Sequence, residues 1–174
     1  MKVLIAILLS IYCSSGSTQS YLKYDLPLET KNSLYTSELN CLASTLYFES
    51  RGLKDRSMAL VGVTTLNRAS SLSGASTVCA TVKKKRSKTS CDYSWWCDGK
   101  SDVMKDLTQR NRAYRIAQEV LAGEHVKLTK ATHFVHCSVV EENSSWLKNM
   151  KYLGRDRDSS GRPAHCFYKN RDRA

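Results

Sequence analysis

Apolar side chains recur at the spacing of one helix face in the stretch that starts near residue 37. The positions on that face are Leu39, Leu42, Ala43, Leu46 and Tyr47. Ser37 stands where a helix needs an N-cap, and Gly52 stands where a glycine commonly ends a helix. The pattern therefore predicts a helix that starts at Ser37 and ends just before Gly52.

Two further helices are predicted downstream. Residues 58–66 form an apolar segment rich in Ala, Leu and Val, which follows a possible cap at Asp55. Its valines and threonines would also suit a strand, but the length of the segment favours a helix. Residues 106–121 predict another helix, which Gly123 terminates. The apolar face of this helix consists of Ala113, Ile116, Ala117, Val120 and Leu121.

The late part of the chain has the composition of β-structure. Residues 132–137 and 165–169 contain the Thr, Phe, Val and Tyr that strands favour, and a long polar connection separates them. Residues 87–102 instead combine two Cys, two Trp and a Tyr without helical period, which indicates a disulfide-stapled loop with exposed aromatic rings. The length of 174 residues suits one core. The predicted fold class is α+β, mainly helical, in a single domain with a small β-sheet or hairpin.

The first residues have the layout of an export signal. Lys2 precedes an apolar run over residues 3–12, and a small polar tail follows. This run is shorter than the roughly 20 residues that a membrane-spanning helix needs. We therefore expect a signal peptide over residues 1–20, an extended leader over 21–32 and a folded domain over 33–174. The domain would be secreted or periplasmic, with no stable membrane span after cleavage. The alternatives are a signal that anchors first and releases later, and a buried core helix.

The cysteines indicate the same compartment. Cleavage after Ser17 would remove Cys13 with the signal and leave an even set of six. These six are Cys41, Cys79, Cys91, Cys97, Cys137 and Cys166. An even set in an exported protein indicates disulfides and an oxidising compartment, although the sequence leaves the pairing open.

The net charge of the chain indicates an anionic partner. The chain carries +11 at neutral pH, and a basic surface attracts nucleic acid, anionic lipid and anionic wall polymers alike. The run from Lys83 to Arg86 reads as a solvated basic loop, whose attraction for anions would weaken with salt. Because the chain is expected to be exported and carries no nucleic-acid fold signature, we expect anionic wall polymers rather than nucleic acid as partners.

Glu49 is the carboxylate that the helical pattern singles out. It falls at the edge of the apolar stripe and in the last turn of the first predicted helix. Desolvation against the apolar face and the negative end of the helix dipole would both raise its pKa, as a general acid requires. Two alternatives stay open: the side chain extends into solvent, or Arg51 pairs with it and lowers the pKa.

Six segments between residues 42 and 168 carry a family resemblance. They are Leu46-Tyr47-Phe48-Glu49-Ser50-Arg51-Gly52, Val61 through Leu66-Asn67-Arg68, Thr77-Val78-Cys79, Tyr93-Ser94-Trp95, Ala131-Thr132-His133-Phe134 and His165-Cys166-Phe167-Tyr168. In this order they resemble the SleB-type cell wall hydrolase family, named for a spore-cortex-lytic enzyme and also found in bacteriophages. The chain departs from the family's usual Glu-Ala-Arg-Gly-Glu core by carrying Leu53 where a second Glu is common.

The resemblance implies a compact lysozyme-like catalytic domain that cuts peptidoglycan between N-acetylmuramic acid and N-acetylglucosamine. The implied route is that of a lytic transglycosylase with Glu49 as its catalytic residue. Glu49 would protonate the glycosidic oxygen and then remove a proton from the sugar's C6 hydroxyl, which closes an anhydro ring. A short domain of this kind with a signal would suit a phage lysis enzyme. The nearest alternative is a hydrolytic muramidase, which uses a second carboxylate. The candidates for that second acid are Asp92, Asp98, Glu141 and Glu142.

Residues from the same segments are the expected binding groups. The substrate-binding candidates are Tyr93, Ser94, Trp95, Trp96, His133 and Tyr168. The aromatic rings of the loop could stack on sugar faces, and the alternative for each of them is core packing beside a disulfide. The residues expected to support the site are Asn67, Arg68 and His165.

A zinc site is the alternative that would change the reaction. The potential ligands are His133, His136, Cys137, His165 and Cys166. Zinc would point to an amidase that acts on the stem peptides, but the spacing matches no standard metal signature and disulfides account for the cysteines. We therefore expect no metal and no cofactor, and a monomer. A non-catalytic wall-binding module is the remaining alternative.

Overall fold

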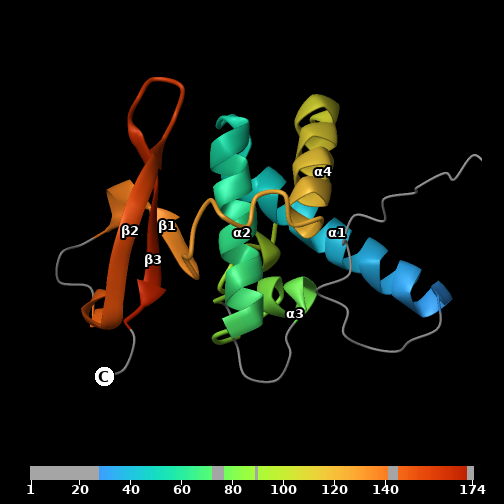
Figure 1. Ribbon diagram of the computed structural model, residues 1–174, viewed down its shortest axis with the longest axis horizontal. Helices are drawn as coiled ribbons and strands as arrows, with labels where there is room; N and C mark the ends of the chain where they lie inside the picture. Colours follow the sequence, from blue (N-terminus) through green and yellow to red (C-terminus); the bar gives the residue numbers. More distant parts are fainter. Residues whose placement is uncertain (1–27, 72–76, 89, 141–144, 172–174) are drawn as a thin grey trace, which may run out of the picture.

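Helices and one small sheet make up the described part of the protein (Figure 1). The computed structural model describes residues 28–71, 77–88, 90–140 and 145–171. The predicted signal peptide and residues 21–27 of the predicted leader lie outside these ranges, as do Glu141 and Glu142. The predicted fold class is confirmed, since the helices dominate and the strands form one antiparallel sheet.

The helical core is built by α1 (Leu28–Ser50), α2 (Asp55–Ser71) and α4 (Leu107–Leu121), with the short α3 (Val78–Val82) against α1 and α2. Apolar side chains of the three long helices meet in one buried cluster. Its almost completely buried members include Leu42, Leu46, Val61, Val63, Ile116 and Val120. The predicted apolar faces are therefore the faces that form the core.

α2 and α4 approach each other closely at a glycine. A Cβ atom added at Gly62 would lie 3.1 Å from Cγ2 of Val120. α4 starts just after Asp106, the predicted first residue of this helix, whose side chain caps it by accepting a hydrogen bond from the backbone N–H of Gln109 at 3.0 Å. Asp55, the predicted cap of the second helix, is the first residue of α2.

α1 begins at Leu28, well before the predicted start at Ser37. Residues 28–32, predicted as part of an extended leader, are therefore helical, and Ser37 lies inside the helix rather than at its cap. Residues 29–37 are mostly exposed. An exposed helical segment carries no apolar face, so periodicity does not reveal it. No Gly or Pro interrupts the helix between residues 28 and 37.

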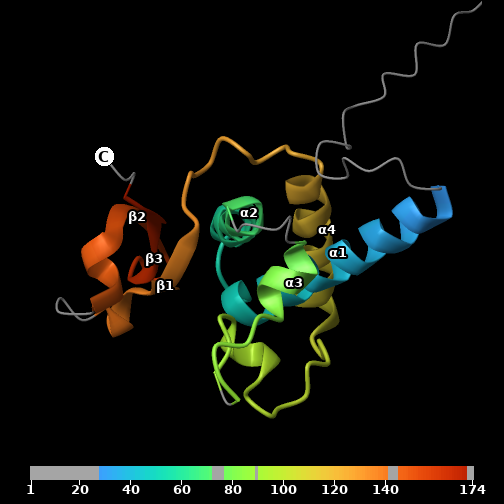
Figure 2. The same cartoon turned by 90° about the horizontal axis from the view of Figure 1, so that it is seen from below.

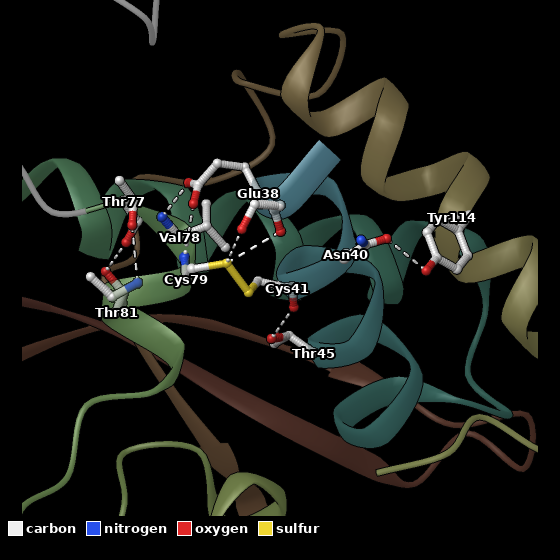
Figure 3. The surroundings of a disulfide bond; sticks show 11 residues. Glu38, Asn40, Cys41, Thr45, Thr77, Val78, Cys79, Thr81 and Tyr114 are labelled. Carbon is white, nitrogen blue, oxygen red and sulfur yellow. Dashed lines mark hydrogen bonds between the residues drawn. A yellow bond between two sulfur atoms is a disulfide. The ribbon is translucent and has the colours of Figure 1, made fainter. Parts of the chain in front are cut away.

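A disulfide and a carboxylate join α3 to α1 (Figure 3). The disulfide connects Cys41 and Cys79. The carboxylate of Glu38 accepts hydrogen bonds from the backbone N–H groups of Val78 at 2.5 Å and Cys79 at 3.2 Å. Because the first N–H groups of a helix have no partner inside it, Glu38 satisfies the start of α3 from a neighbouring element. The other two disulfides are Cys91–Cys97 and Cys137–Cys166, so the predicted disulfides are confirmed.

The sheet has the order β1-β3-β2 and is antiparallel throughout. Its strands are β1 (His133–His136), β2 (Met150–Arg157) and β3 (Pro163–Asn170). The sequence predicted β1 and β3 but placed β2 inside a polar connection. β2 is an edge strand with mostly exposed side chains, including Lys151, Arg155 and Arg157, so it lacks the alternation of apolar and polar residues that marks a half-buried strand.

The sheet lies beside α2, while α1 and α4 lie on the other side of that helix (Figures 1 and 2). Side chains of β3 alternate between two environments, as the pleat of a strand requires. Phe167 belongs to the helical core, whereas Cys166 and Tyr168 belong to a second small cluster with Met150. Within the described residues, no helix is both long enough and apolar enough to cross a membrane.

Candidate functional site

Glu49 lies in the last turn of α1, between two cavities. One cavity has a volume of about 460 Å³ and the other about 330 Å³, and Glu49 and Ser94 line both. The side chain of Glu49 is half-buried. Burial raises the pKa of its carboxyl above 4.5, and the positive charge of nearby His165 opposes this rise. Within the described part of the chain, no hydrogen-bond donor binds the carboxylate.

The larger cavity has an aromatic wall and a charged wall. Phe48 and Trp95 form the aromatic wall, with their rings stacked at 5.1 Å between centroids. Residues 98–105 supply the charged part of the lining, with Asp98 and Asp102 together with two lysines. The cavity that Glu49 lines therefore contains both aromatic rings and other acidic groups.

The smaller cavity is walled by β1, β3 and the stapled loop. His133 and Phe134 of β1 and His165 of β3 line it, together with Arg68 at the end of α2. Burial and the nearby charge of Arg68 lower the pKa of His133 to about 4. His133 is therefore neutral at pH 7, and its Nδ1 lies 2.9 Å from the hydroxyl oxygen of Thr132.

His165, which lines this cavity, forms a buried pair with Asp156. Asp156 of β2 accepts a hydrogen bond from the backbone N–H of His165 at 2.5 Å, and its second oxygen lies 3.2 Å from Nδ1 of the same residue. The side chains are only 6% and 4% exposed for His165 and Asp156. Burial by itself would raise the pKa of Asp156, but the hydrogen bonds from His165 bring it below its ordinary value of 3.8. The pair fixes the position of the His165 imidazole, whose electrostatic interaction with Glu49 lowers the pKa of that carboxyl.

A second buried carboxylate, Asp92, is held by two arginines. Arg68 donates to one of its oxygens at 2.6 Å, and Arg86 donates to the other. Burial would raise the pKa of Asp92, but these two guanidinium groups together lower it. Asp92 lines the smaller cavity as a neutralised anchor of the loop, because both of its oxygens are engaged.

The predicted supporting residues lie around Glu49. The side-chain amide of Asn67 donates to the backbone carbonyls of Thr129 at 3.1 Å and Ala131 at 3.0 Å, which positions the segment that leads into β1. Arg68 and His165 line the smaller cavity directly. Arg51, which the sequence left open as a partner for Glu49, lies over the ring of Tyr47 with its guanidinium carbon 5.2 Å from the centroid.

The aromatic residues predicted to bind sugars lie in different surroundings. Trp95 lines the larger cavity, but the residue is only 8% exposed. Tyr93 lines the smaller cavity, but it is only 4% exposed and donates a hydrogen bond to the hydroxyl of Thr65 at 3.0 Å. Burial raises the pKa of Tyr93 to about 12. The amine of Lys83 lies 4.8 Å from the ring centroid of Trp96. Tyr168 packs in the second small cluster, away from both cavities.

Sequence reasoning missed two residues of the site. Phe48 was part of a quoted segment, yet only the structure shows that it forms the wall beside Glu49. Asp156 lies in the stretch that the sequence predicted as a polar connection, so no pattern could place it next to His165. The potential zinc ligands are partly accounted for, since Cys137 and Cys166 form a disulfide and are not thiolates. Among the described residues, no group of three or more His, Cys, Asp or Glu side chains could hold a metal ion.

Comparison with known protein families matches residues 52–168 to the Cell Wall Hydrolase family. The match covers most of the chain and five of the six quoted segments, and it begins three residues after Glu49. No curated protein and no solved structure matches the chain. The lysozyme-like shape therefore stays a prediction.

Proposed function

Because the chain belongs to the Cell Wall Hydrolase family, whose substrate is peptidoglycan, we propose that it cuts the glycan strands as a lytic transglycosylase with Glu49 as its catalytic acid. The bond cleaved is that between N-acetylmuramic acid and N-acetylglucosamine. The disulfides and the family indicate an extracellular or periplasmic protein. We propose that the N-terminal signal exports it there.

The position of Glu49 carries this proposal. A raised pKa keeps the carboxyl of Glu49 protonated to a higher pH than an ordinary glutamate, and Glu49 lies where two cavities meet. A strand that crosses this point would place one sugar in each cavity and the linking oxygen near Glu49. The arrangement suits an acid that must reach the bond between two bound sugars.

The reaction needs two proton transfers through Glu49. First the protonated carboxyl gives its proton to the glycosidic oxygen, and the bond from that oxygen to C1 of the muramyl sugar breaks. The resulting carboxylate then takes the proton of the C6 hydroxyl, whose oxygen bonds to C1 and closes the anhydro ring. His165, held by Asp156, would stabilise the carboxylate between the two steps by its electrostatic interaction with Glu49.

A hydrolytic muramidase is the second candidate, and one observation favours it. Asp98 and Asp102 line the larger cavity together with Glu49. Either carboxylate could activate a water molecule or stabilise the oxocarbenium ion, as the second acid of ordinary glycosidases does. The two reactions leave different ends: an anhydro ring after transglycosylation and a reducing end after hydrolysis.

Mass spectrometry of the fragments released from purified peptidoglycan tests the proposal. Wild-type protein should release anhydromuramyl fragments, and Glu49→Gln should abolish their release. Glu124→Gln is the matched control, because Glu124 is an exposed glutamate that lines neither cavity. Reducing ends would establish the muramidase instead, free stem peptides would establish an amidase, and binding without release would indicate a wall-binding module. Unchanged release by Glu49→Gln would remove Glu49 from the mechanism.

A further inference from the structure

A third cavity, separate from the two at Glu49, lies between the start of α2 and the edge strand β2. Its volume is about 420 Å³. Four exposed cations line it: Lys54 just before α2, Arg56 in the first turn of α2, and Arg155 and Arg157 from β2. None of these residues lines either cavity at Glu49. The mechanism proposed above leaves this cationic group without a role.

The local charges leave the pocket strongly positive. Asp156 is its acidic lining residue, and hydrogen bonds from His165 already occupy that carboxylate. Asp55, which starts α2, is neutralised by two arginines of α4 at 2.5 and 2.6 Å. The positive end of the α2 dipole adds to the side-chain charges. In the part of the chain that the structure describes, no acid pairs with Lys54, Arg56 or Arg155.

The pocket also has an apolar lining, which a site that binds its ligand by charge alone would not need. Leu60, Leu128, Leu153 and Phe167 contribute to it. Leu153 is 38% exposed and lies at a register shift of the sheet, between the paired residues Tyr152 and Gly154. A bulge of this kind redirects a side chain out of the regular pleat. Cations and aliphatic side chains therefore face the same space.

We propose that this pocket binds a carboxylate-bearing peptide, with the carboxylates on the cations and the small apolar side chains on the leucines. The proposal rests on the proposed function, because each muramyl sugar of peptidoglycan carries a short stem peptide rich in alanine and free carboxylates. A phosphodiester polymer would use the cations but would gain nothing from the leucines. The apolar lining therefore favours the peptide.

The buried pair connects this pocket with the catalytic cavities. Asp156 lines the pocket, and its partner His165 lines the smaller cavity at Glu49. The two spaces thus lie on either side of one hydrogen-bonded pair. A stem peptide held in the pocket would anchor the strand whose sugars lie at Glu49, so strands stripped of their peptides should be poorer substrates.

Isothermal titration calorimetry with the synthetic peptide N-acetyl-L-Ala-γ-D-Glu-L-Lys-D-Ala tests the binding site. The double variant Arg56→Gln/Arg155→Gln should weaken binding about tenfold, as the loss of a charge-assisted contact does. Lys84→Gln/Lys85→Gln is the matched control, since it removes two exposed charges of the same sign that lie outside the pocket. The control should change the affinity by less than about twofold. Equal losses in both variants would overturn the proposal.

A second variant separates the peptide from a phosphodiester polymer. Leu153→Ser should weaken binding of the peptide and leave the binding of inorganic polyphosphate unchanged, because only the peptide uses the apolar lining. If polyphosphate binds more tightly than the peptide and Leu153→Ser affects neither, the pocket is a phosphate site and the proposal is wrong.

The binding experiment and the cleavage experiment test the pocket and the proposed function separately. The peptide contains no glycosidic bond, so its titration does not require an active Glu49 and can be repeated with Glu49→Gln. Peptide binding without any glycan release would leave the pocket in place and refute the proposed function. Glycan release without peptide binding would refute the pocket alone.

Discussion

Replacing Asp156 tests the buried pair that holds His165 beside the catalytic carboxyl. In Asp156→Ala, the backbone N–H and Nδ1 of His165 both lose their acceptor inside a site where the two side chains are only 6% and 4% exposed. Each buried group left without a partner costs about 1–3 kcal/mol, and breaking a buried pair costs about 3–5 kcal/mol in total. We therefore expect Asp156→Ala to lower the free energy of unfolding by about 3 kcal/mol.

The conservative variant Asp156→Asn should cost less, about 1 kcal/mol, because its carbonyl oxygen can still accept from the backbone N–H of His165. The measurement is urea unfolding at pH 7 with the disulfides intact, followed by circular dichroism. A loss below about 0.5 kcal/mol in Asp156→Ala would refute the reasoning, since surface substitutions have effects of that size.

The pH dependence gives an independent check on the same residue. The pKa of Asp156 is lower in the folded protein than its ordinary value of 3.8. Its contribution to stability is therefore fully present above that value and is lost as the pH falls through the folded-state pKa. Wild-type protein should lose this increment on acidification below about pH 4, and Asp156→Asn should not. Parallel pH profiles for the two proteins would contradict the low pKa.

Three further outcomes follow from the structure. Activity should fall as the pH rises through the raised pKa of Glu49, because the acid must be protonated; an activity that keeps rising above neutral pH would contradict this. Gly62→Ala should destabilise the protein by about 1–3 kcal/mol in urea unfolding, since its Cβ would meet Val120 at 3.1 Å. Opening the Cys41–Cys79 disulfide by a double Cys→Ser change should cost about 4 kcal/mol for its separation of 38 residues, and an unchanged unfolding midpoint would show that Glu38 and the core suffice to hold α3.

The helices that build the core could be predicted because each carries a continuous apolar face. Leu42, Val61 and Ile116 lie on such faces and are almost completely buried, as the pattern required. The exposed start of α1 and the edge strand β2 were missed for the opposite reason. Neither has an apolar face to bury: the start of α1 continues the helix's own backbone hydrogen bonds, and β2 pairs with β3. Backbone hydrogen bonds leave no apolar period in the sequence.

Part of the candidate site could likewise be predicted from the sequence, and part could not. Periodicity placed Glu49 at the edge of an apolar stripe, and the resemblance selected it among the acids. The pairing of Asp156 with His165 joins two strands through a contact that only the hairpin between β2 and β3 brings about. Likewise, Tyr93 and Trp95 stand two residues apart in one loop and both pack in the core cluster, yet Tyr93 borders the smaller cavity and Trp95 the larger one.

The sequence by itself therefore indicated the amphipathic helices, the disulfides, the basic charge and Glu49 as the candidate acid. These are local or compositional properties, which a chain expresses before it folds. The tertiary structure decided which cysteines pair, which aromatic rings are buried, which histidine acts on Glu49 and that four cations gather around a third cavity. Each of these depends on contacts between segments far apart in the chain, and such contacts are set by the packing of whole elements rather than by any local pattern.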